Sequence, residues 1–374
     1  MTEFIPVNTP VLDGNELKYL EECISSGWIS SDGPFVEQLE KQFASRVGRK
    51  HGIAVTNGTA AIDASIEALG IGPGDEVILP AFTIISCILQ IVRAGAKPIL
   101  VDSEPFTWNM DVASIESKIT SKTKAIMVVH IYGMPVDMGP VMDLCQRYRL
   151  LLIEDAAEVI GQDYRDKPCG SFGDISTVSF YPNKHVTTGE GGMILTDDDA
   201  VAERCRELRN LCFKPGKRFY HERLGWNLRM TNLQAAVGVA QLERLDEFVE
   251  KKRWIGRTYD QLFVGLSGVQ RPIVEVDYAK NIYWVYGLVL DASVAFDAAE
   301  MIRRLAELKV GARPFFCPMH KQPALVDRGF FRGESYPVAS SLYRRGFYIP
   351  SGLALNEEQI ERVGEAVGEV LKYD

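Results

Sequence analysis

Short apolar runs that alternate with helical segments constrain the fold of this chain more than any other feature. From about residue 51, near-continuous runs of aliphatic and β-branched residues are typical of strands that are buried on both faces. Between two of these runs, Ile62, Ile66 and Leu69 lie at helical spacing, and Gly70 ends the helix. This alternation predicts an α/β fold with a large, mostly parallel, doubly wound sheet. The predicted strands are Ile53–Thr56, Glu76–Leu79, Pro98–Val101, Ala125–His130, Leu150–Glu154, Thr177–Phe180 and Met193–Thr196.

The pattern changes towards the C-terminus, where a long helical stretch ends the alternation. We therefore divide the chain of 374 residues into a large domain, residues 1–250, and a smaller α+β domain, residues 251–374. The smaller domain is predicted to hold a strand over residues 283–290 and helices over residues 296–308 and 356–371. The long stretch has no helix breaker before residues 266–268, and its apolar positions are Leu233, Val237, Leu242, Leu245 and Val249.

Helices are also predicted near both ends of the chain. Leu17, Leu20 and Ile24 indicate an N-terminal helix that packs on one of the two domains. At the other end, Asn356 and Gln359 are typical of an N-cap and its reciprocal partner at the start of the last helix.

Composition excludes several classes of function. A net charge of −9 argues against binding a polyanion such as a nucleic acid. No apolar window is long enough to span a membrane, and the N-terminus resembles no secretion signal. The seven scattered cysteines favour free thiols in a reducing cytoplasm, and the five histidines show no metal-ligand spacing.

Asp155 and Lys184 are the strongest candidates for chemistry. Asp155 ends a buried strand, and Lys184 follows about thirty residues later, just before a Gly-Glu-Gly-Gly turn. Pyridoxal phosphate (PLP) needs such a pair, a lysine amine for its Schiff base and a carboxylate beside its ring nitrogen. Taken singly, Asp155 could cap a following helix, Lys184 could be an ordinary surface lysine, and Glu158 could reach the same site or be solvated.

The turn Asn57-Gly58-Thr59-Ala60 is a candidate phosphate site, because it places backbone N–H groups at the start of a helix. Ser179 could add a hydroxyl group from the strand before Lys184. The alternative is a simple turn in which Thr59 caps the helix. The turn is neither the GxGxxG dinucleotide motif nor a P-loop.

Many motifs in order give the chain its resemblance to a known family. They are WISSDGPFVEQLE, NGTAA, GIGPGDEVILPAFT, VHIYG, IEDAAE, SFYPNKHVTTGEGG, GWNLRMTNLQAA and RPFFCPMH. With them the chain resembles the DegT/DnrJ/EryC1/StrS sugar aminotransferases, which are fold-type I PLP enzymes. The resemblance runs almost from end to end, and it implies a large PLP-binding domain followed by a smaller α+β domain.

The resemblance also implies a role for individual residues. Lys184 would carry PLP, Asp155 would pair with its ring nitrogen, and Glu158 would lie near its ring hydroxyl. Asn227 would reach the phosphate of a neighbouring subunit's PLP, which implies a homodimer with shared active sites. The residues that would hold the phosphate within one chain are Gly58, Thr59 and Ser179, and those near the sugar nucleotide are Arg313 and His320.

Three positions depart from the family pattern or complicate it. The family commonly has an aromatic residue that stacks on the PLP ring where this chain has Ile84, so an aliphatic contact replaces it or Phe82 compensates. Cys317 stands where similar members carry histidine or tyrosine, which bears on the sugar. A related subgroup of dehydratases has histidine in place of the lysine. If the motif were aligned one residue further along the chain, His185 would take the position of that histidine and act as the base.

The implied reaction is transfer of an amino group from glutamate to the 4-keto carbon of a nucleotide-linked 4-keto-6-deoxyhexose. GDP-4-keto-6-deoxymannose is the preferred acceptor. The resemblance further implies a cytoplasmic enzyme that serves lipopolysaccharide O-antigen biosynthesis. The alternatives are an aminotransferase for a UDP- or dTDP-linked keto-sugar or a keto-cyclitol, a PLP-dependent sugar dehydratase, and a non-catalytic regulator.

Overall fold

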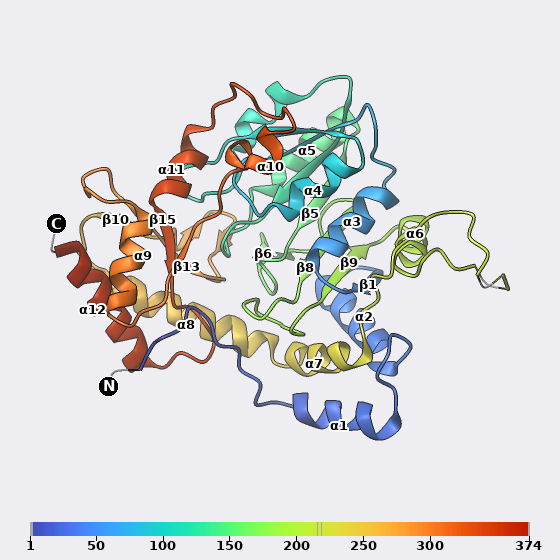
Figure 1. The fold of residues 1–374 in the computed structure, drawn as a ribbon, viewed down its shortest axis with the longest axis horizontal. Coiled ribbons are helices and arrows are strands. Elements are labelled where there is room, and N and C mark those ends of the chain that lie inside the picture. The colour runs from blue at the N-terminus through green and yellow to red at the C-terminus, as the bar shows by residue number, and fades with distance from the viewer. Residues whose placement is uncertain (1–2, 215, 218, 373–374) are drawn as a thin grey trace.

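The seven predicted strands form one sheet in the computed structural model, which describes residues 3–214, 216–217 and 219–372. The strand order is β1-β9-β8-β5-β4-β2-β3. Figure 1 labels β1, β9, β8 and β5 of this sheet. The strands from β8 to β3 are parallel, and β9 runs antiparallel to β8 and β1. The prediction of a mostly parallel sheet is therefore confirmed. The bounds are β1 His51–Val55, β2 Glu76–Pro80, β3 Lys97–Val101, β4 Thr123–Val129, β5 Leu151–Asp155, β8 Ile175–Ser179 and β9 Gly192–Thr196.

Helices cover both faces of this sheet because its strands are apolar on both sides. In β2, Val77 and Leu79 face one core, whereas Ile78 between them faces the other. The first core is covered by α3 (Gly58–Ala68), α4 (Ser86–Arg93) and α6 (Asp199–Arg209). The second is covered by α2 (Pro34–Val47), α5 (Met138–Tyr148) and α7 (Asn232–Leu242).

A second, antiparallel sheet with the order β10-β13-β15-β14 follows in the C-terminal part. Its own core includes Ile5, which pairs with Val310, so the chain around Ile5 packs here, ahead of α1. The strands are β10 Val269–Gln270, β13 Tyr286–Leu290, β14 Arg313–Pro314 and β15 Gly346–Ile349, and the helices are α8 Leu245–Leu262, α9 Ala298–Glu307, α10 Pro323–Val326, α11 Pro337–Arg345 and α12 Glu357–Lys372. The shorter elements of the whole chain are β6 Asp163–Tyr164, β7 Lys167–Pro168, β11 Glu275–Val276, β12 Ala279–Lys280, η1 Val112–Ser114, η2 Glu116–Lys118 and η3 Met319–Lys321.

The long helical stretch is not one helix, because the helical conformation is interrupted at Glu243 and Arg244, between α7 and α8. Val249 of α8 still contacts the second core of the large sheet, whereas Ile255 and Tyr259 belong to the core of the small sheet. The change of partner thus occurs within α8. The division of the chain at residue 250 itself stays a prediction.

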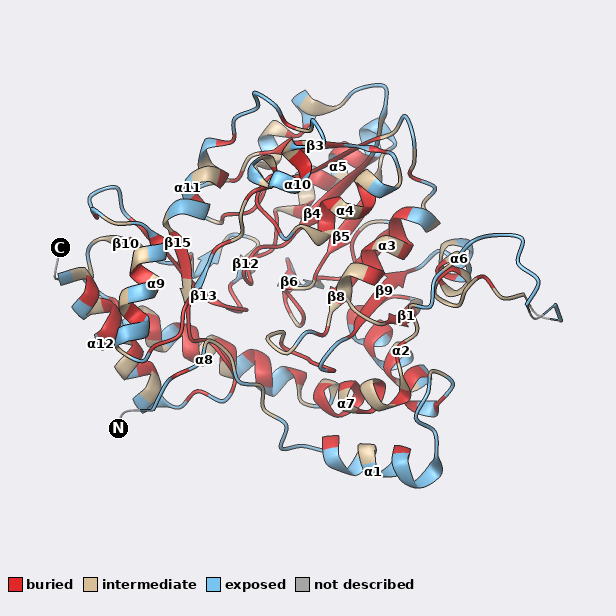
Figure 2. Ribbon diagram, viewed as in Figure 1, coloured by how far each residue is buried: buried red, intermediate tan, exposed pale blue. Residues whose placement is uncertain are grey.

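Of the predictions for the two terminal helices, one is confirmed and the other is confirmed only in part. For α12 the capping pair is confirmed, because Gln359 N donates to Asn356 Oδ1 (2.8 Å) and Asn356 N donates to Gln359 Oε1 (3.2 Å). The helix α1 (Glu16–Ser26) does pack on α7, but not through its predicted apolar stripe. Leu17 and Ile24 are 70% and 66% exposed, Leu20 is half-buried, and Cys23 makes the buried contact instead. Most of α1 is exposed or half-buried (Figure 2). Among the described residues, no helix has the length and apolar character needed to cross a membrane.

Candidate active site

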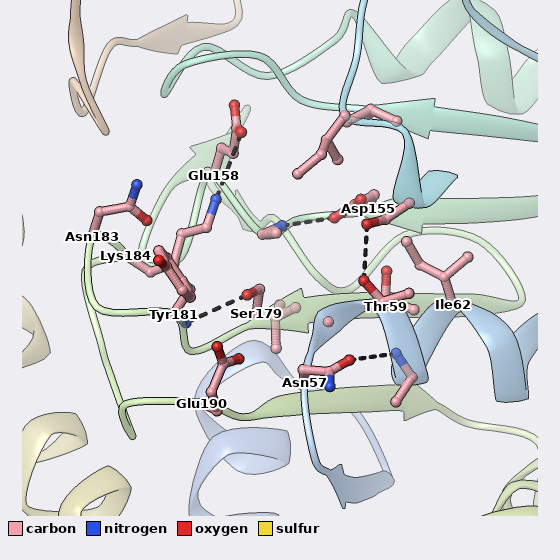
Figure 3. Close-up of a pocket in the computed structure, with 18 of the residues that line it drawn as sticks. Asn57, Thr59, Ile62, Asp155, Glu158, Ser179, Tyr181, Asn183, Lys184 and Glu190 are labelled. Atoms are coloured by element: carbon pink, nitrogen blue, oxygen red, sulfur yellow. Dashed lines mark hydrogen bonds and ion pairs between the residues drawn. The ribbon is translucent and has the colours of Figure 1, made fainter. Parts of the chain in front are cut away.

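A cavity of about 730 Å³ lies where β5 and β8 end and α3 begins (Figure 3). Ligands of doubly wound sheets bind at this edge, beyond the carboxyl ends of the strands. The small sheet closes the cavity from the other side. The described lining residues that the sequence singled out are Asn57, Gly58, Thr59, Ile84, Asp155, Glu158, Ser179 and Lys184.

The N-terminus of α3 forms one end of the cavity. Asn57 caps the helix, since its side chain accepts a hydrogen bond from Ala60 N (2.8 Å), so the alternative with Thr59 as cap is wrong. The Thr59 hydroxyl instead pairs with that of Ser86 (2.8 Å). A Cβ at Gly58 would lie 2.8 Å from the Cβ of Ser179, so only glycine fits between helix and strand. Uncovered N–H groups and hydroxyl groups at a helix N-terminus fit a phosphate.

Asp155 lies deep in the cavity wall and is 5% exposed. Its Oδ1 accepts from Ala157 N (3.0 Å) and its Oδ2 from Cys87 Sγ (3.3 Å). The helix that Asp155 could have capped does not exist, because turns follow β5 up to β6. Burial raises the pKa of Asp155, and a buried carboxylate with two such weak partners fits a protonated ring nitrogen.

Lys184 enters the cavity from the loop between β8 and β9 and extends towards Glu158 (Figure 3). Its Nζ lies 3.6 Å from Glu158 Oε1, and its side chain is 9% exposed. Burial lowers the pKa of Lys184 and raises the pKa of Glu158 to about 7. Glu158 Oε2 also accepts a hydrogen bond from Tyr132 N (2.8 Å). A lysine with a lowered pKa is suited to attack a carbonyl and to carry a proton. Together with Asp155 and the α3 terminus, these residues fit PLP.

His185, the alternative base, is fully buried and does not line the cavity. Ile84 lines the cavity, whereas Phe82 is buried among the aromatic rings of residues 132, 315 and 316. Of the two readings of the ring-stacking position, the structure therefore favours the aliphatic contact at Ile84.

The remaining predicted residues lie at or beyond the rim of the cavity. Asn227 is exposed, is not part of the lining and accepts from Arg229 Nε (2.8 Å). Arg313 is exposed and pairs across the strands with Tyr348, which does line the cavity. His320 does not line the cavity, and its Nε2 lies 3.0 Å from Ser340 Oγ.

Sequence reasoning missed the aromatic side chains that close the cavity. Trp284, Phe316 and Tyr348 come from the C-terminal part of the chain. Trp284 and Tyr348 lie in no motif, whereas Phe316 lies in RPFFCPMH and was passed over in favour of its polar neighbours. Tyr181 and Asn183 lie within the motif that contains Lys184, and that proximity was a usable signal.

A second buried cluster could in principle hold a metal, because His130, Glu154 and Cys169 place ligand atoms within 4.8 Å of one another. Val136 N, however, donates to His130 Nδ1 (3.0 Å), so Nε2 carries the proton and donates to Glu154 Oε1 (3.0 Å). Gly170 N donates to the same carboxylate oxygen (2.7 Å). Because these groups already satisfy one another, we interpret the cluster as structural.

Comparison with known proteins gives matches over nearly the whole chain. The model of the DegT/DnrJ/EryC1/StrS aminotransferase family matches residues 10–368. A GDP-perosamine synthase of Caulobacter vibrioides is 42% identical over 368 residues, which are 98% of this chain and 98% of that protein. Another, of Escherichia coli O157:H7, is 40% identical over 367 residues, also 98% of each chain. The crystal structure of the aminotransferase TlmJ from Streptoalloteichus hindustanus superposes with a TM-score of 0.91 at 30% identity, covering 99% of this chain and 100% of that one.

Proposed function

Because the chain belongs to the DegT/DnrJ/EryC1/StrS aminotransferase family, it is a PLP-dependent sugar aminotransferase, and we propose that it converts GDP-4-keto-6-deoxymannose to GDP-perosamine. Glutamate is the proposed amino donor. One observation carries the proposal for the chemistry: Asp155, Lys184 and the N-terminus of α3 line the same cavity. The choice of sugar is supported by the relatives that are named GDP-perosamine synthase.

We assign the following roles to the chain's own residues. Lys184 binds PLP covalently and, when released, holds and returns a proton at Nζ. Asp155 keeps the ring nitrogen protonated, and Glu158 lies near the ring hydroxyl. PLP itself supplies an electron sink for the carbon that loses or gains the amino group. The phosphate is held by Gly58, Thr59 and Ser179.

We further propose that two copies of the chain complete each other's sites, with Asn227 serving the partner's cofactor. Asn227 is exposed and lies outside the cavity of its own chain. Large apolar side chains are exposed on α1 and near Asn227, including Leu17 (70%), Ile24 (66%) and Leu224 (91%). Large apolar side chains that are exposed on one helix, as Leu17 and Ile24 are, are typical of protein interfaces, which supports a homodimer.

The proposed setting is the cytoplasm, with the product used for the O-antigen of lipopolysaccharide. The seven cysteines support a reducing compartment, because all are free thiols and all but Cys317 are buried.

The sugar specificity is tested by supplying the purified protein with glutamate and, in turn, GDP-, UDP- and dTDP-linked 4-keto-6-deoxyhexoses. We expect mass spectrometry to detect an amino-sugar product with the GDP-linked mannose derivative. The variant Lys184→Ala serves as the matched control and should give no product. Faster turnover of a UDP- or dTDP-linked sugar would overturn the proposed acceptor but leave the aminotransferase assignment intact.

A further inference from the structure

The indole of Trp284 contacts both Lys184 and the loop that carries it. Lys184 Nζ lies 3.6 Å from the centre of the indole ring, and Trp284 Nε1 donates a hydrogen bond to Asn183 O (2.8 Å). Trp284 is only 4% exposed, so this contact is shielded from water. The indole is the aromatic ring that attracts a cation most strongly, and desolvation increases that attraction.

The main chain of Trp284 is in turn held by a buried lysine of α8. Lys252 is 1% exposed, and its Nζ donates to Trp284 O (2.9 Å) and to Ser351 O (2.6 Å). Within the described part of the chain, no ion pair includes Lys252. A neutral amine has two N–H groups, which match these two carbonyl groups, and burial lowers the pKa of Lys252 to about 7.

We propose that Trp284 and Lys252 are positioning residues that fix the amine of Lys184 whenever it is not bonded to the cofactor. Trp284 offers its ring face to Nζ and anchors the loop through Asn183, while Lys252 acts only by holding Trp284. The proposal rests on the role given to Lys184 above, since an aminotransferase releases its lysine in every half-reaction. A long, released side chain returns its proton to the right atom only if its position is fixed.

Other charged and titratable groups also act on Lys184, and they set the direction of each expected change. Carboxylates and a thiol favour the charged amine, whereas burial and a protonated Lys252 disfavour it. The indole face adds to the first group. Leucine keeps an apolar group over the amine but has no ring face, so replacing Trp284 by leucine is expected to lower the pKa of Lys184. Removing a charge from Lys252 would by itself have the opposite effect. The groups that favour the charged amine are Glu158, Asp155 and Cys87, and Lys252 opposes it when protonated. His185 also faces Lys184, but burial lowers the pKa of His185 well below its ordinary value, so its ring is neutral.

The test measures how fast a small amine-acylating reagent modifies Lys184 in cofactor-free protein across a pH series, by peptide mass spectrometry. In Trp284→Leu we expect the midpoint of the pH profile to fall by about one pH unit. In Trp284→Phe, which keeps a ring but loses the N–H donor, we expect a smaller fall in the same direction. Lys252→Met should also lower the midpoint. The midpoint of the double variant Lys252→Met/Trp284→Leu should be no lower than that of Trp284→Leu. The control is Lys251→Met, because Lys251 lies over Trp254 instead (3.9 Å).

Each outcome decides one part of the proposal. An unchanged midpoint in Trp284→Leu, or in Trp284→Phe should the leucine variant not fold, overturns the role of Trp284. A midpoint that rises in Lys252→Met shows that Lys252 acts through its charge and overturns its positioning role. Borohydride labelling in the presence of PLP separates these failures from failure of the proposed function, because only the latter leaves Lys184 unlabelled in the wild type.

Discussion

Replacing Lys252 by methionine should change how the stability of the protein depends on pH. Methionine keeps most of the apolar length of the side chain but removes the amine that holds two carbonyl groups. In the folded protein the pKa of Lys252 is lowered to about 7 from an ordinary value of 10.5. The unfolded chain therefore binds one more proton than the folded chain between these two pH values.

This difference fixes the sign and the size of the effect. Stability rises with pH wherever the unfolded state binds more protons, by at most about 1.4 kcal/mol per pH unit for one group. The wild type should thus gain roughly 2–3 kcal/mol from Lys252 between about pH 7.5 and pH 9.5. Lys252→Met lacks this gain, and at high pH it also leaves two buried carbonyl groups without their donor, at a cost of about 1–3 kcal/mol each.

The measurement is urea unfolding of wild type, Lys252→Met and Lys41→Met at a series of pH values. Lys41 is a suitable control because its side chain is 74% exposed on α2. We expect the stability difference between wild type and Lys252→Met to widen steadily above about pH 7, whereas Lys41→Met should follow the wild type. A difference that stays constant with pH would refute the argument, because it would mean that Lys252 has the same pKa in the folded and unfolded chain.

Four further predictions concern the active site. Borohydride reduction of the wild type with PLP should label Lys184, and Lys184→Ala should fold but show no turnover; a label on another lysine contradicts the assignment. Asp155→Asn should lower kcat by about 1,000-fold, which corresponds to about 4 kcal/mol of barrier, whereas near-normal turnover would mean that Asp155 is only structural. Arg313→Ala and His320→Ala should raise the keto-sugar KM while sparing the glutamate half-reaction, and equal damage to both halves would remove them from the sugar site. Inactive Lys184→Ala and Asn227→Asp subunits should regain activity when mixed, because one heterodimer site then has neither lesion; no recovery despite subunit exchange contradicts a shared site.

Local pattern was sufficient to predict the large sheet and the residues at its edge. Strands buried on both faces produce apolar runs, so all seven were recognisable. Parallel strands also align their ends, which is why Asp155, Ser179 and the α3 terminus could be expected in one place. Two predictions about single side chains were wrong, one about a helix cap and one about which face of a helix is buried. Thr59 lost the cap to Asn57, and the stripe with Leu17 faces outward.

The aromatic wall of the cavity could not be predicted in the same way, because its residues lie in and beside the strands of the second sheet. Trp284 and Tyr348 lie about 100 and 160 residues after Lys184 in the chain, and nothing in their local sequence distinguishes them from core residues. His320 shows another limit of local pattern. Its position in a motif predicts a place near the sugar, and this stays a prediction, but the motif gave no sign that its ring is hydrogen-bonded to Ser340 in α11. A motif fixes the place of a residue in the chain, whereas the direction of its side chain depends on packing.

The lowered pKa of Lys184 follows from this joint construction of the site. The loop between β8 and β9 would leave a lysine solvated if the large sheet stood alone, and a solvated amine is almost entirely protonated at neutral pH. Trp284, which lies just before β13 of the second sheet, covers Lys184, so the lysine side chain is 9% exposed and burial lowers its pKa. Glu158 and the indole face favour the charged amine and so offset part of this lowering of the pKa. The amine can therefore both accept and release a proton. The reactivity of Lys184 therefore depends on how the second sheet packs against the loop, and α8 contributes to that packing through Lys252.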